Sequence, residues 1–418
     1  MKGENHTSRP CADLSLLEFS PGGKRPLYHC APLANRAYYL IMTIPLTRLV
    51  ASLPSTIPFV GPETLERQLG KPFAARIGAN ESAFGMSALA MQAIAAGAAQ
   101  AAWYGDPENH DLRAQLAAQH GVELDEICVD AGIDSLLGLL VRMVVEPGQS
   151  VVTSLGAYPT FNYHVAGFGG QLQTVPYRND HEDPDALLAR ARETGAPLVY
   201  LANPDNPMGT WHPAATIASA LQQIPAGSLL ALDEAYAEFA PPGTLCPIDT
   251  RNDQVIRLRT FSKAHGMAGL RIGYAIAHRD LIAGLNRIRN HFGVNRLAQA
   301  AALASLQDAD FLADVQRRVA LGRDAIGTLA AEHGLTAIAS ATNFVAVDLG
   351  DSERASRLRS ALQDYGVFIR MPGVAPLNRT VRIGVGTEAE HQWLTQVFGD
   401  ALAIADGRLT DTAAGRAA

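Results

Sequence analysis

Lysine is rare in this chain, and one lysine stands among residues suited to chemistry. The sequence of 418 residues holds 34 lysines and arginines, but lysine occurs only at positions 2, 24, 71 and 263. Arginine stays charged in proteins, whereas a lysine whose pKa is lowered can attack a carbonyl carbon as a free amine. Lys263, in the stretch RTFSKAHGMAG, is therefore a candidate nucleophile. Chance placement is the alternative, so its neighbours must decide.

Groups that bind phosphate flank Lys263. Thr260 and Ser262 precede it closely along the chain, and Arg271 follows it by eight residues. Hydroxyl and guanidinium groups donate hydrogen bonds to phosphate oxygens, and the small residues between them let the backbone approach a ligand. The alternative is a glycine-containing loop with incidental hydroxyls.

Two further motifs place polar side chains after apolar runs. In LLALDEAYAEF the run ends at Asp233, and Tyr236 follows three residues later. A buried carboxylate needs a cationic partner, which a protonated ring nitrogen would supply, although an aspartate here could also cap the next helix. In LANPDNPMGTW the prolines favour extended backbone before them, so that the amide of Asn206 projects from a rigid turn. Turn formation alone also explains that composition.

A fourth motif, VDAGIDSLLGLLVRMV, predicts a helix that opens after Gly132. The backbone N–H groups of Ile133 and Asp134 would then form an anion site at its N-terminus. The pattern is weak alone, because many helices begin this way. The glycines do not form GxGxxG after a strand, which argues against a nicotinamide cofactor.

Together the motifs supply an amine, a carboxylate, a planar amide and two phosphate-binding elements. This set fits pyridoxal 5'-phosphate, in which a lysine bonds the aldehyde and a carboxylate holds the proton of the ring nitrogen. The sequence therefore predicts a pyridoxal-phosphate enzyme.

The elements that must position these residues are short apolar runs that alternate with helical patterns. Strands are predicted at 150–154, 197–204, 228–236, 255–262 and 271–277. Strands that alternate with helices indicate a mainly parallel sheet covered on both faces, and ligands bind such sheets beyond the carboxyl ends of the strands. The motifs fall at those ends.

The pattern predicts two domains. A large domain is expected over residues 84–325, and a small α+β domain over 42–83 plus 326–405, with a long helix at 309–333 between them. Residues 1–41 are expected to be disordered or an extension, and 406–418 to form a frayed tail.

Composition excludes several classes of protein. A net charge of −7 and a pI near 5.9 give no electrostatic ground for a nucleic-acid partner. The four cysteines form no CxxC pair, so we expect no disulfide framework and no metal site, and a reducing cytoplasm as the location. The apolar stretch 37–54 is interrupted by Pro45 and Arg48 and is too short and polar to span a membrane.

The motifs also resemble a known family. NPDNPMGT, DEAY and TFSKAHGMAGLRIGYA are similar to the fold type I pyridoxal-phosphate aminotransferases of class I and II, most of all to the histidinol-phosphate aminotransferase branch. IPFVGPETLE, GANES, WYGDPENHDLR, AGID and TVRIGVGT extend the resemblance in order over most of the chain. It implies an α/β fold in which a mainly parallel seven-stranded sheet lies between helices, with a smaller α+β domain.

The resemblance implies roles at the cofactor. Lys263 would bond the aldehyde carbon and then move a proton at the substrate's Cα, while Asp233 pairs with the ring nitrogen. Asn206 and Tyr236 would bind the ring hydroxyl and Phe161 would stack on the ring. The cofactor phosphate would be held by Ile133, Asp134, Thr260, Ser262 and Arg271, and by Tyr104 from a second subunit. A homodimer with a shared active site follows.

The resemblance also implies a substrate site. Arg382 would receive the carboxylate of an amino acid, Arg370 is a second anion-binding candidate, and Asn80 lines the entrance. In histidinol-phosphate enzymes a tyrosine hydroxyl near the position of Phe59 helps to bind the substrate phosphate, and Phe59 lacks it. The expected activity is transfer of an amino group between a small donor and 2-oxoglutarate, with histidinol phosphate or an aromatic or broad range of amino acids as donor.

Two other classes stay open at this point. The same lysine and fold serve decarboxylases and lyases, which make product without an amino acceptor. A cofactor-binding regulatory module would carry an attached DNA-binding domain, and no helix-turn-helix pattern or basic stripe is visible.

Overall fold

The structure, a computed structural model, describes residues 45–54 and 59–409. The segment 1–41, expected to be disordered or an extension, lies outside the described residues. So does most of the expected tail. At the start of that tail, Asp406 accepts a hydrogen bond of 2.7 Å from Nε of Arg354, so this residue is anchored.

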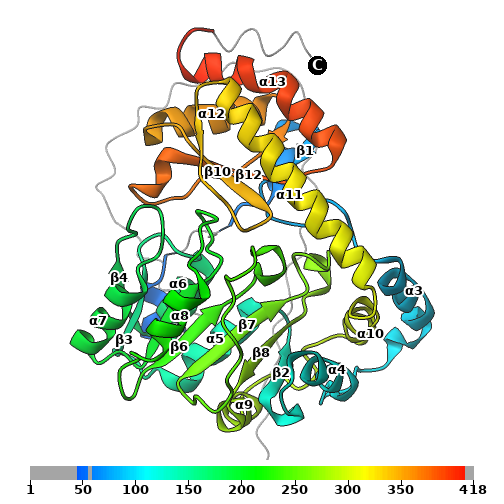
Figure 1. Ribbon diagram of the computed structural model, residues 1–418, viewed down its shortest axis with the longest axis vertical. Coiled ribbons are helices and arrows are strands. Elements are labelled where there is room, and N and C mark those ends of the chain that lie inside the picture. The colour runs from blue at the N-terminus through cyan, green and yellow to red at the C-terminus, as the bar shows by residue number, and fades with distance from the viewer. Residues whose placement is uncertain (1–44, 55–58, 410–418) are drawn as a thin grey trace, which may run out of the picture. The chain divides into compact units, whose positions relative to one another are not determined.

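Among the described residues, seven strands form one sheet in the order β2-β8-β7-β6-β5-β3-β4 (Figure 1). Strands β3 to β7 run parallel to one another, and β8 is antiparallel to both of its neighbours. The predicted mainly parallel sheet is therefore confirmed. The strands are β2 Ile127–Asp130, β3 Ser150–Ser154, β4 Gln171–Val175, β5 Leu198–Ala202, β6 Leu229–Asp233, β7 Val255–Thr260 and β8 Gly273–Ala277.

Helices cover both faces of this sheet because successive side chains of its buried strands point to opposite sides. In β5, Leu198 and Tyr200 pack with one group of helices, while Val199 and Leu201 pack with another. The first group is α5 Ile133–Val144, α6 Pro159–Gly167 and α9 Arg279–Asn286. The second is α7 Pro184–Thr194 and α8 Ala214–Leu221. Near β2 and β8 the cover comes from α3 Ala88–Gly97, α4 His110–His120 and α10 Arg296–Ser305.

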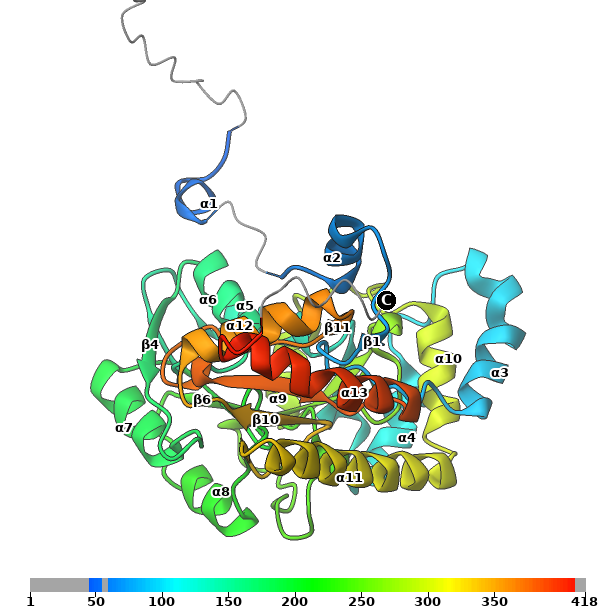
Figure 2. The ribbon, with the colours of Figure 1, turned by 90° about the horizontal axis from the view of Figure 1, so that it is seen from above.

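A smaller group of elements follows the long helix α11, Ala309–Glu332 (Figure 1). It holds an antiparallel sheet of β9 Thr336–Ala337, β10 Phe344–Asp348 and β12 Thr380–Gly384, covered by α12 Ser352–Asp364 and α13 Glu388–Ala405. Strand β1, Ala75–Arg76, pairs with β11, Val367–Phe368, in parallel, so an early segment joins this group. Helices α1 Arg48–Ser52 and α2 Pro62–Leu69 precede β1 along the chain. Figure 2 shows the covering helices α12 and α13 from above. The domain boundaries stay a prediction.

The core of this smaller group reaches the large sheet. Its buried cluster includes residues of α11, α12, α13, β10 and β12, and it also contains Tyr236, Phe239 and Ala264. These three residues follow β6 and β7 along the chain. Lys263 therefore lies directly beside the place where the two cores meet.

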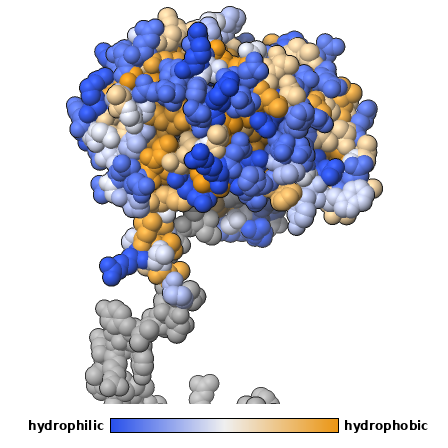
Figure 3. Space-filling model, turned by 90° about the horizontal axis from the view of Figure 1, so that it is seen from below, coloured by the Kyte–Doolittle hydropathy of each residue, from blue (hydrophilic) through white to orange (hydrophobic). Residues whose placement is uncertain are grey.

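The described part of the chain holds no helix long and apolar enough to cross a membrane. Within the same residues, no group of three or more His, Cys, Asp or Glu side chains is placed to hold a metal ion. The surface seen from below mixes hydrophilic and hydrophobic side chains (Figure 3). The remaining short elements are the 3-10 helices η1 Ala98–Ala102, η2 Leu124–Glu126, η3 Ala237–Phe239, η4 Ala268–Leu270 and η5 Leu377–Arg379.

Candidate active site

A cavity of about 220 Å³ opens at the carboxyl ends of β5, β6 and β7. This is where ligands bind in parallel α/β sheets. The cavity brings together nine of the residues expected at the cofactor: Ile133, Asp134, Asn206, Asp233, Tyr236, Thr260, Ser262, Lys263 and Arg271. They come from segments more than a hundred residues apart in the sequence, so the fold itself assembles the site.

Lys263 is the amine of this cavity. Its Nζ donates a hydrogen bond of 3.0 Å to the backbone oxygen of Asn80 and lies 5.6 Å from the ring centroid of Tyr236. Burial, assisted by the positive charge of Arg382, lowers the pKa of Lys263 to about 8. A useful fraction of the side chain is therefore a free, nucleophilic amine near neutral pH.

Asp233 is a buried carboxylate held by two neutral donors. Its Oδ2 accepts a hydrogen bond of 2.8 Å from the hydroxyl of Tyr200, and its Oδ1 accepts one of 2.9 Å from the backbone N–H of Ala235. Burial raises its pKa to about 6, which these hydrogen bonds oppose. An ionised carboxylate in such a place is suited to a cationic ligand group.

Donors for an anion gather at the other end of the cavity. The N-terminus of α5 lacks a capping side chain, so its first N–H groups are free. Nη1 of Arg271 lies 3.4 Å from Oγ of Ser262, and Nη2 lies 3.5 Å from Oδ2 of Asp134. Gly132, at a φ of 85°, lets the guanidinium approach, because a Cβ there would lie 2.5 Å from Nη2 of Arg271. A dianionic phosphate fits this donor set.

A polar network forms the side of the cavity nearest the small sheet. The hydroxyl of Tyr236 accepts a hydrogen bond of 2.9 Å from the amide of Asn80. Nη1 of Arg382 donates one of 2.5 Å to Oδ1 of Asn206. Burial lowers the pKa of Arg382 to about 10, and its Nε is buried without a partner among the described residues. The guanidinium thus keeps capacity for an anionic ligand.

A second, larger cavity of about 650 Å³ shares Lys263, Asn206 and Asp134 with the first. Phe59, Asn80, Arg370 and Arg382, the four residues predicted to bind the substrate, all line this cavity. Phe59 meets Tyr163 edge to face, with ring centroids 6.2 Å apart. The guanidinium of Arg370 lies 5.7 Å from the Phe59 ring and donates a hydrogen bond of 3.0 Å to the backbone oxygen of Val60.

Phe161, expected to stack on the cofactor ring, lines neither of the two cavities. Its side chain has no exposed surface, and its ring is stacked on Tyr200 with centroids 4.8 Å apart. The aromatic residue that lines both cavities is Tyr158, whose hydroxyl donates a hydrogen bond of 2.9 Å to Asp134. Pro159 at the first position of α6 is the missed signal, because it places Phe161 in the helix and Tyr158 in the preceding loop.

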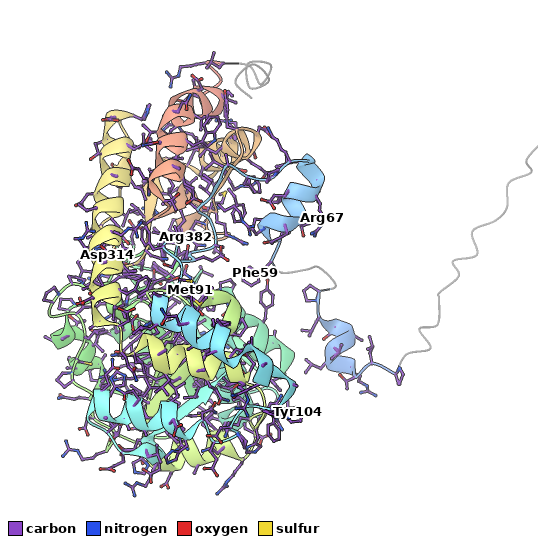
Figure 4. The ribbon with its side chains drawn as sticks, turned by 90° about the vertical axis from the view of Figure 1, so that its right-hand side faces the viewer. Phe59, Arg67, Met91, Tyr104, Asp314 and Arg382 are labelled. Carbon is purple, nitrogen blue, oxygen red and sulfur yellow. The ribbon has the colours of Figure 1, made fainter. Side chains whose placement is uncertain are left out.

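Tyr104 does not reach the cavity of its own chain. It is 77% exposed, packs on Phe292 at 4.8 Å, and lies on the surface well apart from Arg382 (Figure 4). Sequence reasoning also missed Tyr200, which lines the first cavity from the buried strand β5.

Comparison with known proteins identifies the family. Residues 76–398 match the model of the family "Aminotransferase class I and II". The chain belongs to this family. Among its relatives, histidinol-phosphate aminotransferase 2 of Ralstonia nicotianae is 37% identical to this aminotransferase and is matched over 79% of this chain and 89% of its own length. The names of such relatives favour amino-group transfer over the decarboxylase, lyase and regulatory alternatives.

Solved structures agree with this fold. The histidinol-phosphate aminotransferase of Sinorhizobium meliloti, solved in complex with pyridoxal-5'-phosphate, is 51% identical to this aminotransferase, with a TM-score of 0.83. The match covers 86% of this chain and 97% of that one. A double mutant of the aspartate aminotransferase of Thermus thermophilus, 20% identical with a TM-score of 0.72 over 87% of this chain and 99% of that one, shares the fold alone.

Proposed function

We propose that this aminotransferase binds pyridoxal 5'-phosphate and moves the amino group of histidinol phosphate to 2-oxoglutarate. The observation that carries the proposal is the placement of Lys263, Asp233 and the phosphate donors around one cavity. When bound, the cofactor supplies an aldehyde that takes up an amino group and a ring that accepts electrons.

The residues present fit the cofactor at each of its polar groups. The uncapped N-terminus of α5 and Arg271 suit its phosphate, and the neutral surroundings of Asp233 leave that carboxylate free for the ring nitrogen. Asn206 and Tyr236, which line the same cavity, would bind the ring hydroxyl. Lys263 would bind the carbonyl carbon of the cofactor, and its lowered pKa would let the free amine take a proton from the Cα of the donor.

The positive charge of the larger cavity suits substrates that carry anionic groups. Arg382 and Arg370 both line it, and neither forms a salt bridge with a carboxylate among the described residues. The two half-reactions bring a phosphate-bearing amine and a dicarboxylate, each of which needs a guanidinium partner. Arg382 takes the carboxylate beside the reacting carbon, and Arg370 takes the far anionic group.

A second donor class is favoured by one observation. Phe59 and Tyr163 line the cavity and pack edge to face against each other, and Phe59 brings no hydroxyl to a phosphate. An aromatic amino acid would pack its ring against them and give its carboxylate to Arg382. Imidazole and phenyl side chains both suit this wall. The anionic group therefore decides between the donors, because histidinol phosphate carries a phosphate and an aromatic amino acid carries a carboxylate.

The donor screen tests this proposal. The purified protein is supplied with cofactor and 2-oxoglutarate, and glutamate formation is measured with histidinol phosphate, phenylalanine, tyrosine and histidine. Histidinol phosphate is expected to give the highest kcat/KM. If it ranked last, the donor assignment would be wrong, and glutamate formation from the others would still support transamination.

A homodimer is part of the proposal. Tyr104, Trp103 and Phe292 form a small surface of exposed apolar side chains, in which the rings of Tyr104 and Phe292 pack with centroids 4.8 Å apart. Such a surface is typical of an interface. In a dimer that buries this surface, the Tyr104 hydroxyl reaches the phosphate end of the other subunit's cavity.

Mixed dimers test the shared site. Lys263→Ala chains and Tyr104→Ala chains are each expected to be impaired at limiting cofactor. Their mixed dimer has one site with both native residues, so mixing is expected to restore activity. No recovery in verified mixed dimers would show that Tyr104 does not act across subunits. The cytoplasmic location stays a prediction from the cysteine pattern.

A further inference from the structure

We infer that Tyr200 is a positioning residue for catalysis, whose hydroxyl holds Asp233 oriented and negatively charged toward the ring nitrogen of the cofactor. The inference rests on the proposed function, in which Asp233 faces that nitrogen. Its basis is the hydrogen bond of 2.8 Å that the Tyr200 hydroxyl donates to Oδ2 of Asp233. No family motif in the sequence includes this tyrosine.

The two side chains come from neighbouring parallel strands. Tyr200 pairs with Ala231 and Ala202 pairs with Asp233 in the register of β5 and β6, so the tyrosine lies two residues before the level of the carboxylate. Its side chain must extend along the sheet surface to reach Asp233. The ring is held there by the stack on Phe161, with planes 21° apart. The hydroxyl is therefore fixed before any ligand arrives.

The hydroxyl can act only as a donor to the carboxylate. Burial raises the pKa of Tyr200 well above its usual value, so the phenol keeps its proton over the range in which enzymes work. The hydrogen bond stabilises ionised Asp233 against the burial that raises the pKa of this carboxyl to about 6. With Ala235 occupying one lone pair of Oδ1, the cavity-facing lone pairs stay available for the ring N–H.

A purely structural role does not explain the hydroxyl. Tyr200 is 1% exposed in an apolar cluster, where a phenylalanine would fill the same space and stack on Phe161 equally well. Among the described residues, the hydroxyl forms its hydrogen bond with Asp233. Placing a hydroxyl in such a core is favourable only with a partner, and its partner is the carboxylate at the cavity floor.

The test compares Tyr200→Phe with Tyr274→Phe in the full-length protein. Tyr274 lies in β8 of the same sheet, is 4% exposed, and shares a hydrogen bond of 2.9 Å with His120, away from Asp233. Two probes are titrated into the cofactor-free chain: pyridoxal phosphate and its analogue with carbon in place of the ring nitrogen. Thermal unfolding of each variant checks that it folds.

Wild type and Tyr274→Phe are expected to prefer pyridoxal phosphate over the analogue. In Tyr200→Phe the preference should fall about tenfold or more, since a hydrogen bond to a charged group is lost. Binding of the analogue should change little. An unchanged preference, or equal losses for both probes, would overturn the inference.

A third variant separates this inference from the proposed function. If Asp233→Asn keeps the full preference for pyridoxal phosphate, the carboxylate does not face the ring nitrogen and the proposed binding mode fails. If Asp233→Asn abolishes the preference while Tyr200→Phe leaves it intact, only the role of Tyr200 is wrong.

Discussion

Asn80 contacts Lys263 and Tyr236 at once. Its backbone oxygen accepts a hydrogen bond of 3.0 Å from Nζ of Lys263, and its side-chain amide donates a hydrogen bond of 2.9 Å to the hydroxyl of Tyr236. Asn80 has a φ of 56°, a left-handed conformation that asparagine tolerates better than most residues. One residue of the entrance segment thus orients both the amine and the phenol of the site.

The amine of Lys263 should react at lower pH than ordinary lysine. Burial lowers its pKa from 10.5 to about 8. About half of the side chains are therefore free amines at pH 8, and nearly all are at a pH one to two units higher. In the cofactor-free chain, reductive methylation of Lys263 by formaldehyde should level off near pH 9. Free Nα-acetyl-lysine is the control, and it should still gain reactivity toward pH 11 because its pKa is about 10.4. If the pH profiles of methylation for Lys263 and Nα-acetyl-lysine had the same midpoint, the lowered pKa of Lys263 would be contradicted.

Asn80→Asp should shift this profile upward. The substitution keeps the shape and the left-handed backbone but adds a negative charge to the side chain that contacts Tyr236, whose ring centroid lies 5.6 Å from Nζ of Lys263, and this charge favours the protonated amine. We expect the pH midpoint for Lys263 methylation to rise by about one unit or more. Glu81→Gln removes a negative charge that raises the pKa of Lys263, so it is the opposite control and should lower the midpoint.

Gly132→Ala should weaken cofactor binding beyond its effect on stability. The new Cβ would lie 2.5 Å from Nη2 of Arg271, which must then leave the phosphate end of the cavity. Gly148→Ala is the matched control, because Gly148 also has a positive φ, 89°, but its Cβ would meet nothing within 4 Å. Both variants should lose unfolding free energy, Gly132→Ala about 1–3 kcal/mol because its φ of 85° and ψ of 170° lie in a region that is essentially restricted to glycine. Only Gly132→Ala should show a raised Kd for pyridoxal phosphate, and equal Kd values would argue against the phosphate site.

The sequence predicted the cofactor end of the site better than its walls. Strand ends are marked by where apolar runs stop, which placed Asp233 correctly at the carboxyl end of β6, whereas the strand predicted at 255–262 runs two residues beyond the end of β7 at Thr260. Strands β2 and β4 were missed, because β2 has only four residues and β4 is a partly exposed edge strand. Chain order also cannot show contacts between β5 and β6, so the bond from Tyr200 to Asp233 appears only in the fold.

The same limit explains the aromatic wall. Phe161 has the residue type expected for stacking, but its place in the first turn of α6 directs it into the core against Tyr200. Whether a side chain at a helix start faces a cavity depends on the angle at which the helix packs. That angle is set by tertiary packing with α5 and the sheet, which no local pattern encodes.

Arg382→Gln and Arg370→Gln should separate the two anionic groups of the substrates. Arg382 binds Asn206 in the cavity that Lys263 also lines. Under the proposed function, its loss should raise KM for 2-oxoglutarate about 10- to 100-fold, which is the effect of losing one or more hydrogen bonds to a charged group. Loss of Arg370 should raise KM for histidinol phosphate and leave phenylalanine nearly unchanged. Equal effects of Arg370→Gln on both donors would place the phosphate elsewhere.

The most direct test of the account is chemical trapping of the cofactor. The protein is incubated with pyridoxal phosphate, reduced with borohydride, digested, and mapped by mass spectrometry. Four lysines are possible targets, at positions 2, 24, 71 and 263. We expect one labelled site, Lys263, and loss of both label and transamination in Lys263→Ala. Stoichiometric labelling of another lysine, or full transamination by Lys263→Ala, would contradict it.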